Sequence, residues 1–228
     1  MTADEGEDIT TIETRIVYQN RWMRVREDAI RRRDGSTGIY GVVEKSDFVV
    51  IAPLEDDGRL HLVQQFRYPV RSRYWEFPQG SWEQAPHAEP VEMARGESRE
   101  ETGLVAARMT YAGHLFEAPG YATQGCHIFL ATGLQRTEDD REREEQDLVT
   151  REFPLSEVER MIREREIKDS TTVAALGHLR LKGAMAASSC FGWHRGATPD
   201  TRWGHRPRGH RRGSARRGCR SLWRGRRR

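Results

Sequence analysis

The stretch that decides the fold is Gly96–Leu104, with the sequence GESREETGL. Its three glutamates, Glu97, Glu100 and Glu101, stand at positions i, i+3 and i+4, so in a helix they share one face. Three like charges on an exposed face repel one another by about 0.2–0.5 kcal/mol per pair. A hard divalent cation such as Mg²⁺ offsets that repulsion, because Mg²⁺ prefers oxygen ligands and bridges carboxylates to phosphates.

The sequence around these glutamates predicts a helix over Val91–Thr102. Pro90 suits its first turn, where the missing N–H costs nothing, and Gly103 is well placed to end it in a left-handed conformation. A metal-free interpretation is also open at this point. In that case the glutamates form a solvated acidic face that Arg95 and Arg99 neutralise.

The eighty residues before this helix favour β-structure. β-Branched and aromatic residues alternate with polar ones, and the turn signals Asp34-Gly35 and Asp56–Gly58 separate the alternating runs. The expected strands are Thr11–Tyr18, Arg21–Arg32, Gly38–Glu44, Asp47–Leu54, Arg59–Tyr68 and Tyr74–Phe77.

After the helix, strands return and two further helices close the predicted domain. Ser156 and Glu159 have the spacing of a capping box at the start of the first of these helices. The expected strands are Arg108–Phe116, Gly125–Ala131 and Leu148–Phe153, and the expected helices are one with Leu155, Val158 and Ile162 at helical spacing and one over about Ser170–Leu181. This order of elements predicts a layered α+β domain.

Charge divides the chain into two parts. Thirteen arginines and a single acid, Asp200, give residues 184–228 a net charge of +12, whereas residues 1–183 carry 25 basic and 34 acidic residues, a net charge of −9. The basic part cannot bury enough apolar surface to offset the entropy of ordering it, so we expect disorder there. We therefore expect a flexible N-terminus at 1–9, a folded domain at 10–183 and a disordered tail at 184–228.

Two interpretations of the tail fit its composition. Arginine, glycine and aromatic residues together can bind nucleic acid through phosphate neutralisation and stacking. GC-rich coding DNA translated out of frame gives the same composition. We favour a frame error or an extension without function, and do not expect a nucleic-acid partner.

Three cysteines, Cys126, Cys190 and Cys219, are too scattered for a disulfide framework or a CxxC zinc motif. The acidic N-terminus lacks the apolar segment of a secretory signal, and no run of the sequence is long enough to span a bilayer. We therefore expect a cytoplasmic protein that does not enter the membrane.

The stretch Gly80–Leu104 resembles the Nudix box, G-x5-E-x7-R-E-U-x-E-E-x-G-U, where U is an aliphatic residue. Glu97 matches the Glu of the R-E pair, and Glu100, Glu101, Gly103 and Leu104 match E-E-x-G-U residue by residue. The resemblance implies a Nudix α/β/α sandwich. With the β-rich N-terminal extension and the disordered basic C-terminal tail, the expected class is α+β.

The chain departs from the box in its first half. The segment from Gly80 to Glu97 is two residues longer than the pattern, Gly96 and Ser98 occupy the Arg and aliphatic positions, and the mid-box Glu is replaced, with Glu89 nearby. These changes affect the residues that brace the loop more than the residues that would bind the metal.

The sequences YWEFPQG, FEAPGY and EEQDLV resemble those of ADP-ribose and nucleotide-sugar pyrophosphatases. This implies metal-dependent hydrolysis of a nucleoside diphosphate sugar such as ADP-ribose to a nucleoside monophosphate and a sugar phosphate. The expected cofactor is Mg²⁺, with Mn²⁺ as an alternative. Thr123-Gln124 stands where many ADP-ribose enzymes carry a Glu. A non-catalytic ligand-sensing Nudix module is the alternative function.

The resemblance also implies roles for particular residues. Glu97, Glu100 and Glu101, with a backbone carbonyl of Gln79 or Gly80, would bind the metal, and Glu144 or Glu145 would supply the general base. Substrate binding is assigned to Arg67, Glu76 and Gly80, although Arg67 fits a surface arginine at a strand end equally well. His61, His114 and His127 lack ligand spacing and are interpreted as structural.

The N-terminal strands exceed what the sandwich needs for its own core. Exposed strand edges pair readily with another chain, and related pyrophosphatases use such a region to pair subunits. We therefore expect a homodimer whose small-molecule ligand is a nucleoside diphosphate.

Overall fold

The computed structural model describes residues 8–82, 88–137 and 147–185. Strands in these ranges form three sheets, and three α-helices pack against them. The strands are β1 (Ile9–Gln19), β2 (Arg24–Arg32), β3 (Thr37–Glu44), β4 (Phe48–Pro53), β5 (Arg59–Arg67), β6 (Ser72–Glu76), β7 (Gln79–Gly80), β8 (Leu104–Phe116), β9 (Gly125–Arg136) and β10 (Val149–Pro154). The helices are α1 (Pro90–Thr102), α2 (Leu155–Arg163) and α3 (Ser170–Leu181), with a 3-10 turn at Tyr68–Val70.

The predicted helix around the glutamates is confirmed at both ends. Helix α1 begins at Pro90, and Gly103 follows its last turn with φ +67°, in the left-handed region. The N–H of Gly103 donates to the carbonyls of Arg99 and Ser98 and so closes the last turn of the helix. Helix α3 likewise spans the residues expected from the sequence.

The structure corrects two local predictions. Helix α2 has Pro154 at its N-cap and no side-chain capping hydrogen bond, so Ser156 and Glu159 form no capping box. Glu159 pairs instead with Arg180 of α3. Strand β7 was not predicted from the sequence. It has only two residues, which are too few to show the alternation of apolar and polar side chains that is typical of a strand.

The central sheet has the strand order β7-β4-β9-β8, with β4 and β9 parallel and the other pairs antiparallel. Strand β4 is buried on both faces. Val49 and Ile51 pack with Met93 and Ala94 of α1, whereas Val50 and Ala52 pack with α2 and α3 residues such as Val158 and Leu179. Because side chains alternate along a strand, one short apolar run joins two core layers.

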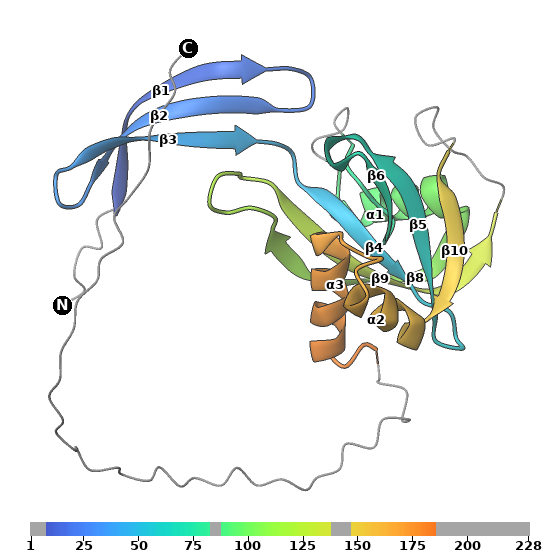
Figure 1. Ribbon diagram of the computed structural model, residues 1–228. Helices are drawn as coiled ribbons and strands as arrows, with labels where there is room; N and C mark the ends of the chain where they lie inside the picture. Colours follow the sequence, from blue (N-terminus) through green and yellow to red (C-terminus); the bar gives the residue numbers. More distant parts are fainter. Residues whose placement is uncertain (1–7, 83–87, 138–146, 186–228) are drawn as a thin grey trace, which may run out of the picture. The chain divides into compact units, whose positions relative to one another are not determined.

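Helices therefore cover the two faces of this sheet, with α1 on one and α2 and α3 on the other (Figure 1). The second sheet, of order β10-β5-β6, contributes Leu60 and Leu62 to the core shared with α2 and α3. This arrangement confirms the predicted α/β/α sandwich. It places the loops before β4, after β5 and before α3 near one another around a cavity.

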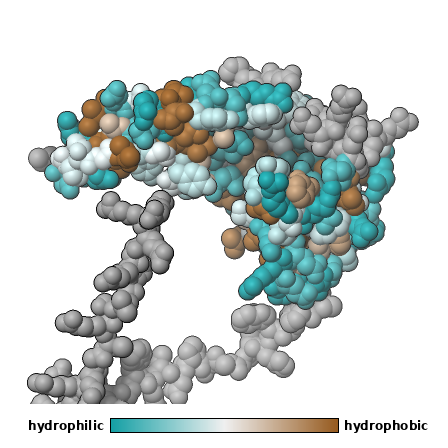
Figure 2. Space-filling view, turned by 45° about the horizontal axis from the view of Figure 1, so that its top comes forward, coloured by the Kyte–Doolittle hydropathy of each residue, from teal (hydrophilic) through white to brown (hydrophobic). Residues whose placement is uncertain are grey.

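The N-terminal extension forms its own antiparallel sheet, with the order β1-β2-β3. Every residue of β1 is exposed, and apolar side chains gather on this sheet (Figure 2). Ile39, for example, is 70% exposed. The sheet contacts the FEAPGY loop where the Tyr40 hydroxyl donates to the carbonyl of Gly120 and Val43 bridges Ala122.

The packed region extends slightly beyond both ends of the expected domain. Strand β1 begins at Ile9, and Met185 is buried with only 4% exposed. Met185 joins the core beneath α3, so the predicted boundary after Gly183 falls two residues short of the packed chain. The predictions for residues 1–7 and for the tail from 186 onward lie outside the described residues. No helix in the described part is long and apolar enough to cross a bilayer.

Candidate functional site

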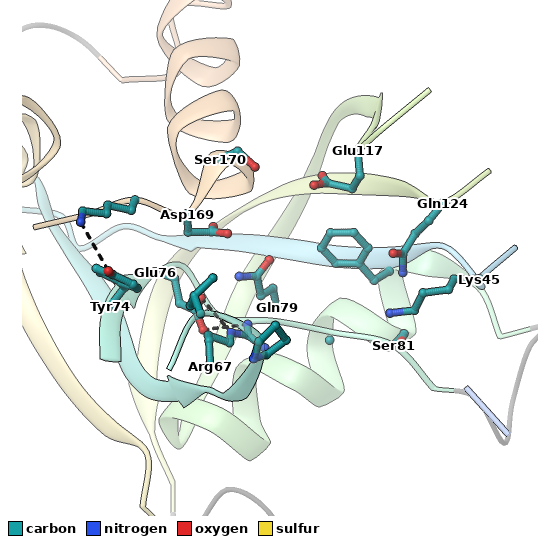
Figure 3. Close-up of a pocket in the computed structure, with 15 residues that line it drawn as sticks. Lys45, Arg67, Tyr74, Glu76, Gln79, Ser81, Glu117, Gln124, Asp169 and Ser170 are labelled. Atoms are coloured by element: carbon teal, nitrogen blue, oxygen red, sulfur yellow. Dashed lines mark hydrogen bonds and ion pairs between the residues drawn. The ribbon is translucent and has the colours of Figure 1, made fainter. Parts of the chain in front are cut away.

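A cavity of about 730 Å³ opens beside β7, and residues far apart in the sequence line it. Three of them are cationic: Lys45 precedes β4, Arg67 ends β5 and Lys168 precedes α3. Figure 3 shows Lys45 and Arg67 beside the cavity, with Gln79 between them. Three carboxylates, those of Glu76, Glu117 and Asp169, line the same cavity. A volume of this size accommodates a nucleotide-sized ligand, and the three cations can pair with its phosphates.

Arg67 pairs with a buried carboxylate in the wall of this cavity. Its Nη2 lies 2.7 Å from Oε1 of Glu76, and its Nε donates to Oε2 at 3.2 Å. Glu76 is 1% exposed. Burial raises the pKa of the Glu76 carboxyl, and the charge of Arg67 opposes that rise. The structure therefore brings these two predicted residues together, with Arg67 as the partner of Glu76.

The predicted glutamates lie directly behind β7. Glu97 and Glu101 are 5% and 1% exposed, and the N–H of Gln79 donates to Oε2 of Glu101 at 3.0 Å. A Cβ atom added to Gly80 would lie 2.3 Å from Oε2 of Glu97. A side chain at position 80 would therefore displace the Glu97 carboxylate. Only glycine lets the strand approach this face of α1 so closely.

Strand β7 connects the glutamates to the cavity. Gln79 and Gly80 line the cavity, whereas Glu97, Glu100 and Glu101 stand on the helix packed against the strand. The Glu100 side chain is 20% exposed and lies 3.9 Å from Arg99. Nη1 of Arg95 donates to the carbonyl of Ala106.

The donor chemistry of this face suits a hard cation, since it consists of carboxylate oxygens beside backbone carbonyls. The carboxylates are not drawn into one cluster in this structure. In the described residues, the groups with three ligand atoms within 4.8 Å of one another are Asp47–His114–His127 and Glu55–His61–Glu152, and neither includes a glutamate of α1.

Sequence analysis missed the contribution of the segment before α3. Asp169 caps α3, accepting from the N–H of Thr172 at 2.7 Å, and the Thr172 hydroxyl donates to Asp169 while accepting from the N–H of Phe77. Lys168 lies beside Tyr74, with Nζ 3.4 Å from the hydroxyl. The Asp169-Ser170 start of a helix was the one available signal, and it carries no information about Arg67 or Tyr74.

The remaining predicted residues have different outcomes. Gln124 lines the cavity, and its Nε2 donates to the carbonyl of Ser46 at 2.8 Å. Trp75, next to Glu76 in the sequence, packs edge-on against Phe153 with ring centroids 4.9 Å apart. Glu144 and Glu145 lie outside the described residues.

His114 and His127, interpreted from the sequence as structural, lie close together in the fold. They pair across β8 and β9, and each directs a ring nitrogen at Asp47. Asp47 and His114 are 67 residues apart, and His114 and His127 are 13 residues apart, so no local sequence pattern indicates this cluster. The strand register alone brings the three residues together.

Comparison with known proteins agrees with this geometry. The family model described as "NUDIX domain" matches residues 44–175, and the one described as "Nucleoside diphosphate sugar hydrolase N-terminal domain" matches residues 9–43. The boundary between them falls at the end of β3, where the N-terminal sheet gives way to the sandwich.

Two curated relatives align over most of their length. The ADP-ribose pyrophosphatase of Bacillus subtilis is 29% identical over 178 residues, which is 78% of this chain and 95% of the relative. The ADP-ribose pyrophosphatase of Mycobacterium tuberculosis is 29% identical over 202 residues, 88% of this chain and 93% of the relative. A solved structure titled "Crystal structure of ADP compounds hydrolase" has a TM-score of 0.69 at 24% identity, covering 78% of this chain and 96% of its own, and shows the same fold.

Proposed function

This chain belongs to the Nudix family, and from that premise we propose that it hydrolyses the diphosphate linkage of a nucleoside diphosphate sugar such as ADP-ribose. The products are a nucleoside monophosphate and a sugar phosphate. The observation that carries the proposal is the cavity with Lys45, Arg67 and Lys168 in its walls, which meets the glutamate face of α1 at Gln79–Gly80. The similarity to two ADP-ribose pyrophosphatases along most of their length supports this substrate class.

The cavity supplies the groups that a diphosphate needs. Lys45, Arg67 and Lys168 lie in its walls, so a ligand with two phosphates can be neutralised from more than one side. The pairing of Arg67 with Glu76 fixes the guanidinium, which leaves its remaining N–H groups oriented for a phosphate oxygen. Arg67 and Glu76 therefore bind and position the substrate together.

Nudix enzymes generally need a divalent metal, and we propose Mg²⁺, with Mn²⁺ as the alternative. Glu97, Glu100 and Glu101, with a carbonyl of Gln79 or Gly80, would hold it. Such an ion neutralises phosphate oxygens and lowers the pKa of a bound water. The buried position of Glu101, fixed by the N–H of Gln79, keeps its carboxylate oriented toward β7.

A proton must still be removed from the attacking water. Glu144 and Glu145 remain our proposed bases, because both stand in the charged segment between β9 and β10. A carboxylate that reaches the cavity from that segment would act only when a substrate is bound.

A homodimer and a reducing compartment complete the proposal. The wholly exposed β1 and the apolar side chains of the N-terminal sheet support pairing of two subunits through this sheet. The free thiol of Cys126, buried in the core, is consistent with a cytoplasmic protein.

A substrate panel tests the function. We expect kcat/KM for ADP-ribose or another nucleotide sugar to be far above that for nucleoside triphosphates or dinucleoside polyphosphates, measured with Mg²⁺ as phosphate released after phosphatase treatment. The Glu101→Gln variant should lose several orders of magnitude in kcat while remaining folded, because its amide oxygen can still accept from Gln79. Glu92→Gln, an exposed position on the same helix, is the matched control. Equal loss in both variants, or a preference for a triphosphate, would refute the proposal.

A further inference from the structure

Three potential metal ligands converge at one end of the central sheet, outside the site described above. Asp47 immediately precedes β4, His114 lies in β8 and His127 in β9. His114 and His127 are direct partners in the strand register, and the β4–β9 register places Asp47 next to the start of β9. Rigid strands therefore hold all three side chains.

The distances between the ligand atoms match the needs of a small cation. Oδ2 of Asp47 lies 3.0 Å from Nε2 of His114 and 3.7 Å from Nε2 of His127, and the three atoms lie within 4.8 Å of one another. A tetrahedral zinc ion with bonds of about 2.0–2.1 Å separates its ligand atoms by roughly 3.3 Å. Both distances to Asp47 lie within about 0.4 Å of that spacing, and an ion would replace the hydrogen bond between Oδ2 of Asp47 and Nε2 of His114.

The surrounding backbone is shaped around this cluster. The second carboxylate oxygen of Asp47, Oδ1, accepts from the N–H of Gly125 at 2.8 Å, which fixes the carboxylate and leaves Oδ2 toward the histidines. A Cβ atom at Gly125 would lie 2.2 Å from Nε2 of His114, so glycine makes the space for this ring. A register shift between Tyr111 and Gly113 sets the side on which His114 projects.

Charge and access also suit a cation. Within the described residues, Asp47 forms no ion pair with Lys or Arg, so no side-chain cation has to be displaced there. The side chains are between about a quarter and a half exposed, at 43% for Asp47, 27% for His114 and 24% for His127. Asp47 and His127 also line a cavity of about 340 Å³, which leaves room for water on the ion.

The second cluster in the described residues lacks these properties. Glu152 pairs with Arg59 at 2.6 Å and with Arg136 at 3.2 Å, so two cations already neutralise it. His61 is 1% exposed, and its Nε2 contacts Glu55 at 2.7 Å. A metal ion would have to displace both arginines to bind there.

We propose that Asp47, His114 and His127 form a binding site for a divalent transition metal of the zinc class, with water completing the coordination. Imidazole nitrogens and one carboxylate are typical ligands for zinc, in contrast to the all-oxygen donors of α1, which suit magnesium.

The site has a structural consequence for the cavity. Gln124, which lines the larger cavity, donates to the carbonyl of Ser46, and Gly125 is held by Asp47. An ion that fixes Asp47 would therefore restrain both segments at the edge of the cavity. Zinc binding should raise the melting temperature of the folded chain, because a ligand bound only by the native state stabilises it.

Zinc titration of the full-length chain tests the site. The protein is stripped of metal, supplied with excess Mg²⁺ to fill oxygen sites, and titrated with Zn²⁺ against a chromophoric chelator. We expect wild type to bind one more equivalent of zinc than His114→Asn or His127→Asn. Zinc should raise the melting temperature of wild type but not of these two variants. His178→Asn, which removes a histidine elsewhere in the fold, is the control and should behave like wild type.

Two further measurements keep the test decisive if a histidine variant fails to fold. Asp47→Asn retains an oxygen to accept from Gly125, so it should fold and yet lose the zinc equivalent. In wild type, Co²⁺ should give the visible absorption of a tetrahedral site. Equal zinc stoichiometry and affinity in wild type and Asp47→Asn would overturn the proposal. Because the readout is metal binding, this result is independent of whether the chain hydrolyses nucleotide sugars.

Discussion

At the scale of single residues, close contacts explain why particular amino acids occupy the site. Gly80 is required because Glu97 lies where its side chain would be. Glu76 remains buried in the cavity wall because Arg67 partly offsets the cost of burying its charge, although its pKa is still raised. Each of these residues is explained by one neighbour that is distant in the sequence.

Gly80→Ala should lower kcat with little effect on overall folding. The new methyl group would push the Glu97 carboxylate away from its position, and a displacement of about 1 Å at a catalytic group can cost roughly a hundredfold in rate. Gly177→Ala, where a Cβ atom meets nothing within 4 Å, is the control and should leave kcat unchanged. Steady-state kinetics on both variants measures the difference, and unchanged kcat in Gly80→Ala would show that Glu97 need not hold that position.

At the scale of elements, the two C-terminal helices begin in different ways. Helix α3 has a side-chain cap, because Asp169 accepts from the N–H of Thr172, whereas α2 begins after Pro154 without one. The α3 cap also reaches the central layers, since the Thr172 hydroxyl accepts from the N–H of Phe77. The start of α3 is therefore both a local helix signal and a tertiary contact beside the cavity.

Asp169→Ala should destabilise the protein by about 1 kcal/mol or more, since loss of an N-cap typically costs 0.5–2 kcal/mol. Ser156→Ala in α2 should change the free energy of unfolding by much less, because its side chain forms no cap. Urea denaturation of both variants tests this difference. Equal destabilisation would mean that Ser156 has a role in α2 equivalent to that of Asp169 in α3.

At the scale of the whole molecule, the N-terminal sheet bears on dimerisation, and the residues after α3 bear on the stability of the fold. The sheet leaves large apolar side chains exposed, among them Ile12, Tyr18 and Ile39. At the end of the described residues, by contrast, Met185 joins the core with Leu176 and Leu179 of α3.

We expect light scattering at micromolar concentration to give the mass of a dimer. Ile39→Glu should shift the protein toward the monomer, because it places a charge on an exposed apolar position of the N-terminal sheet. Leu181→Glu is a matched control, since Leu181 is 91% exposed on α3, away from that sheet. A monomeric mass for wild type would refute the dimer.

A chain that ends at Met185 should keep the melting temperature and activity of the full-length protein. A chain that ends at Gly183 should be less stable by roughly 2 kcal/mol, because burying a methionine side chain contributes about 1.5–3 kcal/mol. Thermal unfolding and activity of the two truncated proteins distinguish the contribution of Met185 from that of the arginine-rich tail. Loss of activity on ending the chain at Met185 would show that the tail participates.

The sequence by itself determined the elements and the face of α1 that carries the glutamates. Helical periodicity places Glu97, Glu100 and Glu101 together, and Pro90 and Gly103 mark the ends, because these signals act over a few residues. Spacing also predicted α3 and most strands. The resemblance to ADP-ribose and nucleotide-sugar pyrophosphatases extended the prediction to a substrate class, which local periodicity cannot show.

Only the tertiary structure decided which distant residues meet. Register between β8 and β9 joins His114 to His127 beside Asp47, and the packing of β7 on α1 brings Gly80 against Glu97. The capping of α3 by Asp169 and its connection to Phe77 likewise depend on how the layers pack. These contacts could not be predicted from the sequence, because they join positions tens of residues apart through sheet register and core packing, which no local pattern encodes.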